Sequence, residues 1–503
     1  MSSPLNTSST QTLRPSLGWG GLLVLGISNI LGAGVFVMTG TAAAFFSGPA
    51  VTISFLLAGF AVLLVALCYT ELASCLPESG SSYTYCRRIL GNVPGWSLGW
   101  LLFLEFSVAA SLVAVGFSGY LLSLLADFGI HVPATVSTAL ITATNGPNGG
   151  TEFGIGNGVN LIAALSVLCV GGILALGISR SASLSALLVV VKIAVLLAFL
   201  VVGVRAVDPA NWHPYVPANE GGFRYGWEGV ARGASLLYFA FLGFETVSTA
   251  AAEARDPQRD MPIGILGSLA VCASLYVLVA VVLTGIVPFR ELGVPDPIAV
   301  AVNRIGWPWI AIVIKIGALA GLGSVLLANA FGHSRMCYAM SRDGLLPPLF
   351  SSLHPRRNSL WKANLLLAGI AAVNAALLPM AVLADLISFG VALTFVCIGI
   401  SLIHMRTTRP ELVGRFRVPL GGVWIRGIWF GTVPVLAIVV SIAMTLPVTL
   451  DLIGQARRGE WLPTCLMLSY LAIGIAIYTF YGRARVSASW RMPAIAASSV
   501  SER

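Results

Sequence analysis

Long apolar runs recur along this chain of 503 residues, with short polar connections between them. Only 10% of the residues are charged and 57% are hydrophobic, whereas a soluble globular chain carries about 25% charged residues. A run of about 20 apolar residues is long enough to cross a bilayer as a helix. Because a helix satisfies its own backbone hydrogen bonds in lipid, these runs predict an all-α membrane protein.

Twelve runs are long enough to span. When the N-terminus is placed inside, arginine gathers in the connections on that side, most densely at Arg335, Arg342, Arg356 and Arg357. This bias accounts for the net charge of +9 without a nucleic-acid partner, and it predicts a multi-pass protein of the cell (inner or plasma) membrane with both termini cytoplasmic. The runs lie near 18–46, 49–73, 92–125, 158–178, 184–205, 229–252, 262–287, 308–338, 361–380, 383–404, 428–450 and 462–481.

The polar residues outside these runs do not form a catalytic pattern. The eight cysteines are scattered without metal-ligand spacing, and the histidines near the predicted inner face stand singly. No HExxH motif is present. We therefore expect no enzyme, no cofactor and no metal. The Gly-, Asn- and Pro-rich segment 127–157 is expected to be an outer connector without chemistry of its own.

The first run contains Gly32, Ala33 and Gly34. Glycine is unfavourable inside a helix, and a break at membrane depth leaves N–H and C=O groups that lipid cannot satisfy. One interpretation is therefore a discontinuous helix, whose second half begins at a binding site with its N–H groups and positive dipole end facing an anion. The other is a patch of small residues that lets a neighbouring helix pack closely.

The sixth run has a second interruption, FAFLGFE at 239–245. It falls in the first span of a second set of five, as the glycine break does in the first set. Paired interrupted helices at corresponding positions indicate the binding site of a transporter, so the pair favours the discontinuous interpretation. Since five is odd, the second set of spans would enter from the opposite side and the two repeats would be inverted.

Several motifs together resemble the amino acid–polyamine–organocation superfamily, in particular bacterial relatives of the cationic amino acid transporters. The resemblance extends over roughly residues 15–410 and weakens in the last two spans. The motifs are LGAGVFV at 31–37, SGPAV at 47–51, LCYTEL at 67–72, ESGSSYTY at 78–85, FAFLGFE at 239–245, DPQRDMPIG at 256–264 and YAMSRDGLLP at 338–347.

The resemblance implies the leucine-transporter fold, with 12 transmembrane helices, a five-plus-five inverted repeat, and discontinuous helices 1 and 6. The expected parts are a disordered cytoplasmic N-terminus (1–16), a ten-helix transport core (17–410), helices 11 and 12 (411–482) and a cytoplasmic tail (483–503). The substrate carboxylate would meet N–H groups at Gly32, Ala33 and Gly34. The ammonium would meet carbonyls near Ile30, Phe239, Ala240 and Leu242, and the rings of Phe239 and Phe241 would form an outer lid.

Three polar residues lie inside predicted spans. Lys192 is either a snorkelling lysine or, by resemblance to the proton-dependent branch, an ammonium that replaces a sodium ion and couples transport to protons. Glu105 either faces the site, where it would favour a cationic substrate, or is a structural hydrogen-bonding group. Asn329 either lines the side-chain pocket, as the resemblance implies, or forms a polar contact between helices.

These observations predict a secondary active permease that imports L-amino acids, either cationic ones such as arginine and lysine or small neutral ones. By resemblance, transport is expected to be coupled to protons and independent of sodium. A polyamine (putrescine) carrier and an amino acid exchanger of the same fold are the alternatives. The expected partners are the amino acid, the proton and the lipid bilayer. The sequence leaves the oligomeric state open.

Overall fold

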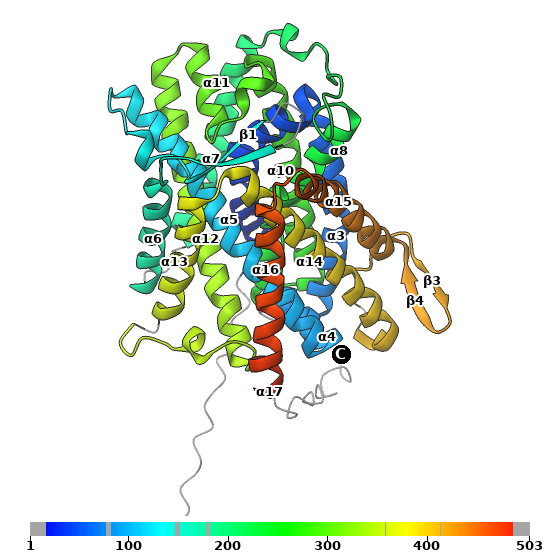
Figure 1. The fold of residues 1–503 in the computed structure, drawn as a ribbon. Coiled ribbons are helices and arrows are strands. Elements are labelled where there is room, and N and C mark those ends of the chain that lie inside the picture. The colour runs from blue at the N-terminus through cyan, green and yellow to red at the C-terminus, as the bar shows by residue number, and fades with distance from the viewer. Residues whose placement is uncertain are drawn as a thin grey trace, which may run out of the picture.

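A computed structural model describes residues 17–76, 82–145, 151–177, 182–357, 359–412 and 414–485. The protein is a bundle of helices, most of which run side by side along one common direction (Figure 1). The predicted N-terminus (1–16) lies outside the described residues, and so do most of the tail and the start of the 78–85 motif.

The main helices coincide with the predicted apolar runs, and the first and sixth runs are each divided among more than one element. They are α1 (Trp19–Ile30), α3 (Val51–Cys75), α5 (Asn92–Asp127), α6 (Leu161–Ala175), α7 (Ala182–Gly203), α8 (Gly226–Leu237), α9 (Glu245–Thr249), α10 (Pro257–Ile286), α12 (Pro308–Arg342), α13 (Trp361–Leu377), α14 (Met380–Thr408), α15 (Thr432–Arg457) and α16 (Leu462–Ile477).

Nine helical stretches of the described residues are long and apolar enough to cross a membrane, which supports a multi-pass membrane protein. The first, Trp19–Cys75, has 57 residues, about 86 Å as one helix, and it contains two of the predicted runs. The chain turns at Gly48, whose φ of +61° suits glycine, before α3 begins. The apolar helices α6 and α13 are shorter. The twelve spans and the inverted repeat therefore remain predictions.

Short elements connect the long helices. α4 (Ser82–Leu90), α11 (Pro297–Ile305) and α17 (Arg483–Arg485) are short helices, and α2 (Thr39–Ala42) is one helical turn of the first run. The predicted outer connector contains an antiparallel pair, β1 (Ile141–Asn145) and β2 (Thr151–Ile155), in which Ile141 lies opposite Ile155. A second pair, β3 (Gly422–Ile425) and β4 (Ile428–Gly431), precedes α15.

The helix α15 is bound to α8 and the turn that follows α8 by three polar contacts. Arg232, Ser235 and Tyr238 are spaced one turn apart and so share one face of the helix. Tyr238 bonds to Ser441 across 2.9 Å, and Ser235 donates to the carbonyl of Met444. The helix α15 is thus in direct contact with the first half of the interrupted sixth span.

The third contact belongs to a buried ion cluster. The guanidinium of Arg232 pairs with Asp385 of α14 and, at 3.4 Å, with Asp451 of α15. It also lies 4.7 Å from the ring centre of Phe46. A buried cation is stable only when its charge is compensated, so the two carboxylates fix α8 between α14 and α15.

We expect Asp385→Ala to lower the melting temperature in detergent far more than Asp451→Ala. Asp385 is the more buried carboxylate (9% exposed, against 18% for Asp451), and removing one partner of a buried pair costs about 3–5 kcal/mol. The pair with Asp451 is longer and less buried, so its loss should cost less. Thermal unfolding followed by size-exclusion chromatography measures both shifts. Equal, small shifts would show that the cluster does not stabilise the fold.

Candidate functional site

The first span is interrupted where the glycines predicted it. The helix α1 ends at Ile30, and Leu31 leaves the helical region with φ −69° and ψ 89°. A π-helical segment, Gly34–Met38, then begins the second half of the span. The first N–H groups of this half have no partner within their own helix, so they are available at the break.

The sixth span is interrupted at the predicted position too. After α8 a tight helical turn covers Tyr238–Phe241, Leu242 is extended with ψ 146°, and α9 begins at Glu245. Between them Gly243 has a φ of +116°, which only glycine adopts without strain. The discontinuity of both spans is confirmed.

The two breaks touch each other. A Cβ atom on Gly34 would lie 2.7 Å from both the carbonyl oxygen and the Cβ of Ala240. A Cβ on Gly243 would lie 2.5 Å from the backbone carbon of Asn29. Each of the two interrupted segments therefore needs a glycine where they cross. Their close approach brings the open amides of one break next to the carbonyls of the other.

The backbone carbonyls freed by the breaks are partly satisfied by side chains. The hydroxyl of Tyr276 on α10 lies within hydrogen-bond distance of the carbonyls of Ile30 (2.6 Å) and Ala240 (3.1 Å), one from each break, and these two carbonyls share its single proton. Its pairing explains how non-helical backbone persists at membrane depth. The sequence analysis missed Tyr276, and its only signal is a phenol inside the apolar run of α10.

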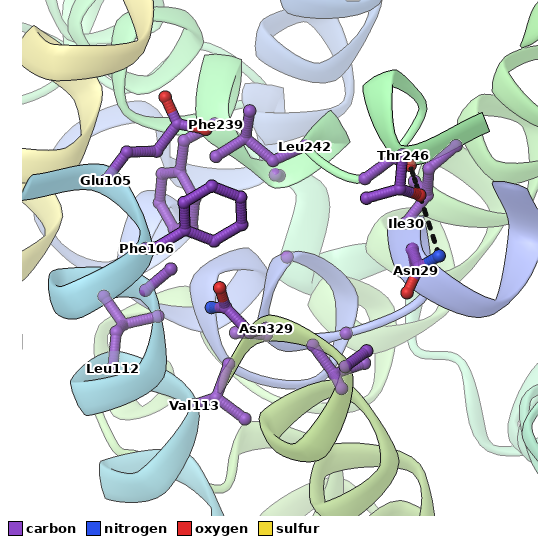
Figure 2. A pocket seen from close by; sticks show the side chains of 18 of the residues that line it. Asn29, Ile30, Glu105, Phe106, Leu112, Val113, Phe239, Leu242, Thr246 and Asn329 are labelled. Atoms are coloured by element: carbon purple, nitrogen blue, oxygen red, sulfur yellow. Dashed lines mark hydrogen bonds between the residues drawn. The ribbon is translucent and has the colours of Figure 1, made fainter. Parts of the chain in front are cut away.

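A cavity lies against the crossing (Figure 2). Its space, including the part open to its mouth, is about 640 Å³. Nine of the ten predicted substrate residues line it, namely Ile30, Gly32, Ala33, Gly34, Glu105, Phe239, Ala240, Leu242 and Asn329. The other walls come mainly from α5 and α12 and are apolar, with Phe106, Ala109, Leu112, Val113, Val325 and Ala328.

The tenth predicted residue, Phe241, is not brought to the cavity. Its ring is fully buried and packs 6.3 Å from the ring of Phe55 and 5.3 Å from that of Tyr276. The tight turn at Tyr238–Phe241 has about three residues per turn, so positions 239 and 241 face different directions. Of the two rings expected to form a lid, only Phe239 borders the cavity.

Two carboxylates lie at the cavity. Glu105 is 3% exposed, and no hydrogen bond from a described residue reaches its Oε2. Glu245, which we did not include among the site residues, accepts a hydrogen bond from the amide of Gly243 at 2.8 Å. On the same side the amide of Asn29 donates to Thr246 at 2.8 Å and joins the ends of α1 and α9 (Figure 2). The sequence analysis missed the hydrogen bond between Asn29 and Thr246 as well.

The predicted coupling residue, Lys192, is separate from the cavity lining but contacts the first break. Its side chain is fully buried, and its ammonium donates to the carbonyl of Ser28 near the end of α1 at 2.8 Å. A Cβ on Gly321 of α12 would lie 3.3 Å from the Cγ of Lys192, so the lysine side chain extends from α7 between α1 and α12. A snorkelling lysine would place its ammonium in water. This one instead binds the backbone beside the break.

Comparison with known proteins gives the family. The profile of the family described as amino acid permease matches residues 17–482. The chain belongs to the amino acid permease family. This family consists of transporters, and its members lie within the amino acid–polyamine–organocation superfamily that the motifs indicated.

Similar permeases differ in the substrate that their names state. The chain is 38% identical to the methylthioribose transporter of Bacillus subtilis (strain 168), over 95% of this chain and 97% of that protein. It is 37% identical to the branched-chain amino acid permease BcaP of the same organism, over 95% of each chain. It is 33% identical to the vacuolar cationic amino acid transporter 4 of Arabidopsis thaliana, over 78% of this chain and 63% of that protein.

We expect Gly34→Ala to reduce transport at least tenfold, equivalent to about 1.4 kcal/mol, because its Cβ would overlap Ala240 and push the breaks apart. Gly172→Ala is the matched control, since a Cβ there meets nothing within 4 Å in the helix α6. Uptake per folded protein in proteoliposomes compares the two. Wild-type uptake by Gly34→Ala would mean that the close crossing is dispensable.

Proposed function

We propose that this permease imports L-amino acids across the cell membrane as a secondary active transporter. The observation that carries the proposal is the crossing of the two breaks at the cavity. Open amides of the second half of the first span and carbonyls of the sixth span meet there, at Gly34 and Ala240. An amino acid has an anionic and a cationic group on one carbon, and this pairing of backbone donors and acceptors complements both.

In this proposal the carboxylate binds the N–H groups of Gly32, Ala33 and Gly34. The ammonium binds the carbonyl oxygens near Ile30, Phe239, Ala240 and Leu242. The carbonyls of Ile30 and Ala240 share the single proton of the Tyr276 hydroxyl, and because a carbonyl oxygen has two lone pairs, each can accept a further donor.

Two substrate classes have support from different walls of the cavity. The charged side chains that line it, Glu105 and Glu245, are both acidic, which favours a cationic side chain such as that of arginine or lysine. The walls from α5 and α12 are apolar around Asn329, which favours a neutral aliphatic side chain. The neutral amide of Asn329 is compatible with either class.

We propose that Lys192 couples transport to protons without sodium. Its ammonium binds the carbonyl of Ser28, two residues before the end of α1, so loss of its proton removes the charge and weakens the hydrogen bond beside the break. The proposal includes the orientation expected from the arginine distribution, with both termini in the cytoplasm.

The first test is uptake by purified protein in sodium-free proteoliposomes, with and without an inward proton gradient. Labelled arginine, leucine and alanine are offered in parallel, and unlabelled putrescine is the competitor. We expect gradient-driven uptake of an amino acid and weak competition by putrescine, which lacks the carboxylate that the amides would hold. Strong competition by putrescine would favour a polyamine carrier. Strict dependence on internal amino acid at every pH would favour an exchanger.

The coupling hypothesis predicts that Lys192→Ala loses the stimulation of uptake by an inward proton gradient. Lys362→Ala is the matched control, because Lys362 lies in the first turn of α13, and its ammonium is 5.5 Å from the ring centre of Trp361, far along the chain from the breaks. The comparison uses uptake at several external pH values with internal pH fixed. If Lys192→Ala retained the wild-type pH profile, the lysine would be a structural cation.

A further inference from the structure

The hairpin formed by β3 and β4 has an apolar face that no other described part of the chain covers. The strands pair in the register Val423 with Phe430 and Ile425 with Ile428. They are joined by Arg426 and Gly427, both with positive φ (50° and 80°), as in the two-residue turn that fits the twist of a hairpin. Since side chains alternate between faces, these two pairs lie on the same face.

The opposite face fixes the hairpin to the bundle. Trp429 is buried at 5% exposure, its amide donates to Thr407 of α14 at 3.0 Å, and the guanidinium of Arg406 lies 4.3 Å from its ring. Arg406 in turn binds both carboxylate oxygens of Glu71 at 2.5 and 2.7 Å. The hairpin is thus held in a defined orientation by the end of α14.

The free face is apolar and strongly exposed. Val423 is 65% exposed, Ile425 53%, Ile428 45% and Phe430 38%. A hairpin that packs on one face normally presents polar side chains on the other. Four apolar side chains in two cross-strand pairs instead indicate a surface that is covered by something apolar.

The position of the hairpin indicates what covers it. It lies between the end of α14 at Thr408 and the start of α15 at Thr432, at the level where two apolar helices end. Figure 1 shows it standing out sideways from the bundle rather than continuing along the helices. Beyond it, α15 exposes Leu436 and Val439, as a helix face toward lipid does. The apolar face is therefore continuous along the chain with a surface that faces lipid.

The basic residues around the hairpin indicate which kind of lipid headgroup it would contact. Arg426 forms the tip, and Arg415 and Arg417 precede the hairpin; all three are exposed. Each basic side chain near an anionic membrane contributes about 1 kcal/mol of attraction. Basic residues around an apolar face therefore complement anionic headgroups above acyl chains.

We propose that the β3–β4 hairpin rests in the headgroup layer of the membrane, with Val423, Ile425, Ile428 and Phe430 against the acyl chains and Arg415, Arg417 and Arg426 against anionic headgroups. It fixes the inner connection between α14 and α15 to the lipid. This inference does not depend on the transported substrate.

The test measures how deep one residue of the hairpin lies. Ile428→Cys is made in a background where the exposed Cys169 and Cys465 are serine, spin-labelled, and reconstituted in vesicles of phosphatidylcholine with or without phosphatidylglycerol. A label at Leu165, an exposed apolar position of α6, is the standard for a residue that faces lipid. A label at Arg304, an exposed residue near the end of α11, is the standard for a residue that faces water.

We expect the label at Ile428 to be relaxed more by oxygen than by a water-soluble nickel complex, as at Leu165, and more so with phosphatidylglycerol. Nickel access like that at Arg304 would overturn the proposal. Dipolar broadening that disappears on dilution with unlabelled protein would also overturn it, because a second copy would then cover the face.

A charge variant tests the anionic component separately. Replacing Arg415, Arg417 and Arg426 with glutamine leaves the apolar face unchanged, so the label at Ile428 should keep its preference for oxygen. Its response to phosphatidylglycerol should disappear. A response equal to that of the parent protein would show that the arginines do not contact the headgroups. Thermal stability measured in detergent confirms that both proteins are folded.

Discussion

The structure depends on backbone polar groups that must be satisfied at membrane depth. Two spans open at Gly34 and Gly243, and each opening is possible only because the other lies against it with no side chain between them. The hydroxyl of Tyr276 then bonds to one carbonyl from each break. Unpaired carbonyls in lipid would cost several kcal/mol each. The crossing is therefore both the weakest point of the two helices and the place where polar groups remain to bind a solute.

The lysine beside the crossing belongs to the same arrangement. An isolated lysine inside a span is unfavourable, but Lys192 supplies a donor to the carbonyl of Ser28 at the end of α1. Its ammonium and the break therefore stabilise each other: the charge has a partner, and the helix end has a donor. This mutual dependence gives a physical reason why a change of charge at Lys192 would alter the geometry of the first break. In that way a proton could act on a cavity that the lysine does not line.

The sequence could predict the two breaks because glycine inside an apolar run is a local signal, and it could predict most of the cavity because those residues flank the breaks. It could not predict the bond between Tyr276 and Ile30 or the bond between Asn29 and Thr246, each of which joins residues more than 200 positions apart along the chain. The sequence alone does not distinguish a tyrosine or an asparagine that forms a hydrogen bond from one that only packs against its neighbours. The position of Phe241 was missed for another reason. The turn at Tyr238–Phe241 is tighter than an α-helix, which alters the face on which each ring lies.

The two halves of the sixth span have different polar contacts. The first half, α8, is bound to α14 and α15 through Arg232 and Ser235, and Tyr238 continues this line to Ser441. The second half, α9, is bound to the end of α1 through Thr246. The extended residue Leu242 and the positive φ of Gly243 separate them. A change in φ and ψ at a few residues at the end of a helix is enough to let the segments on either side rotate relative to each other. Each half can thus follow its own partners, and the cavity lies at the point where the two sets of contacts separate.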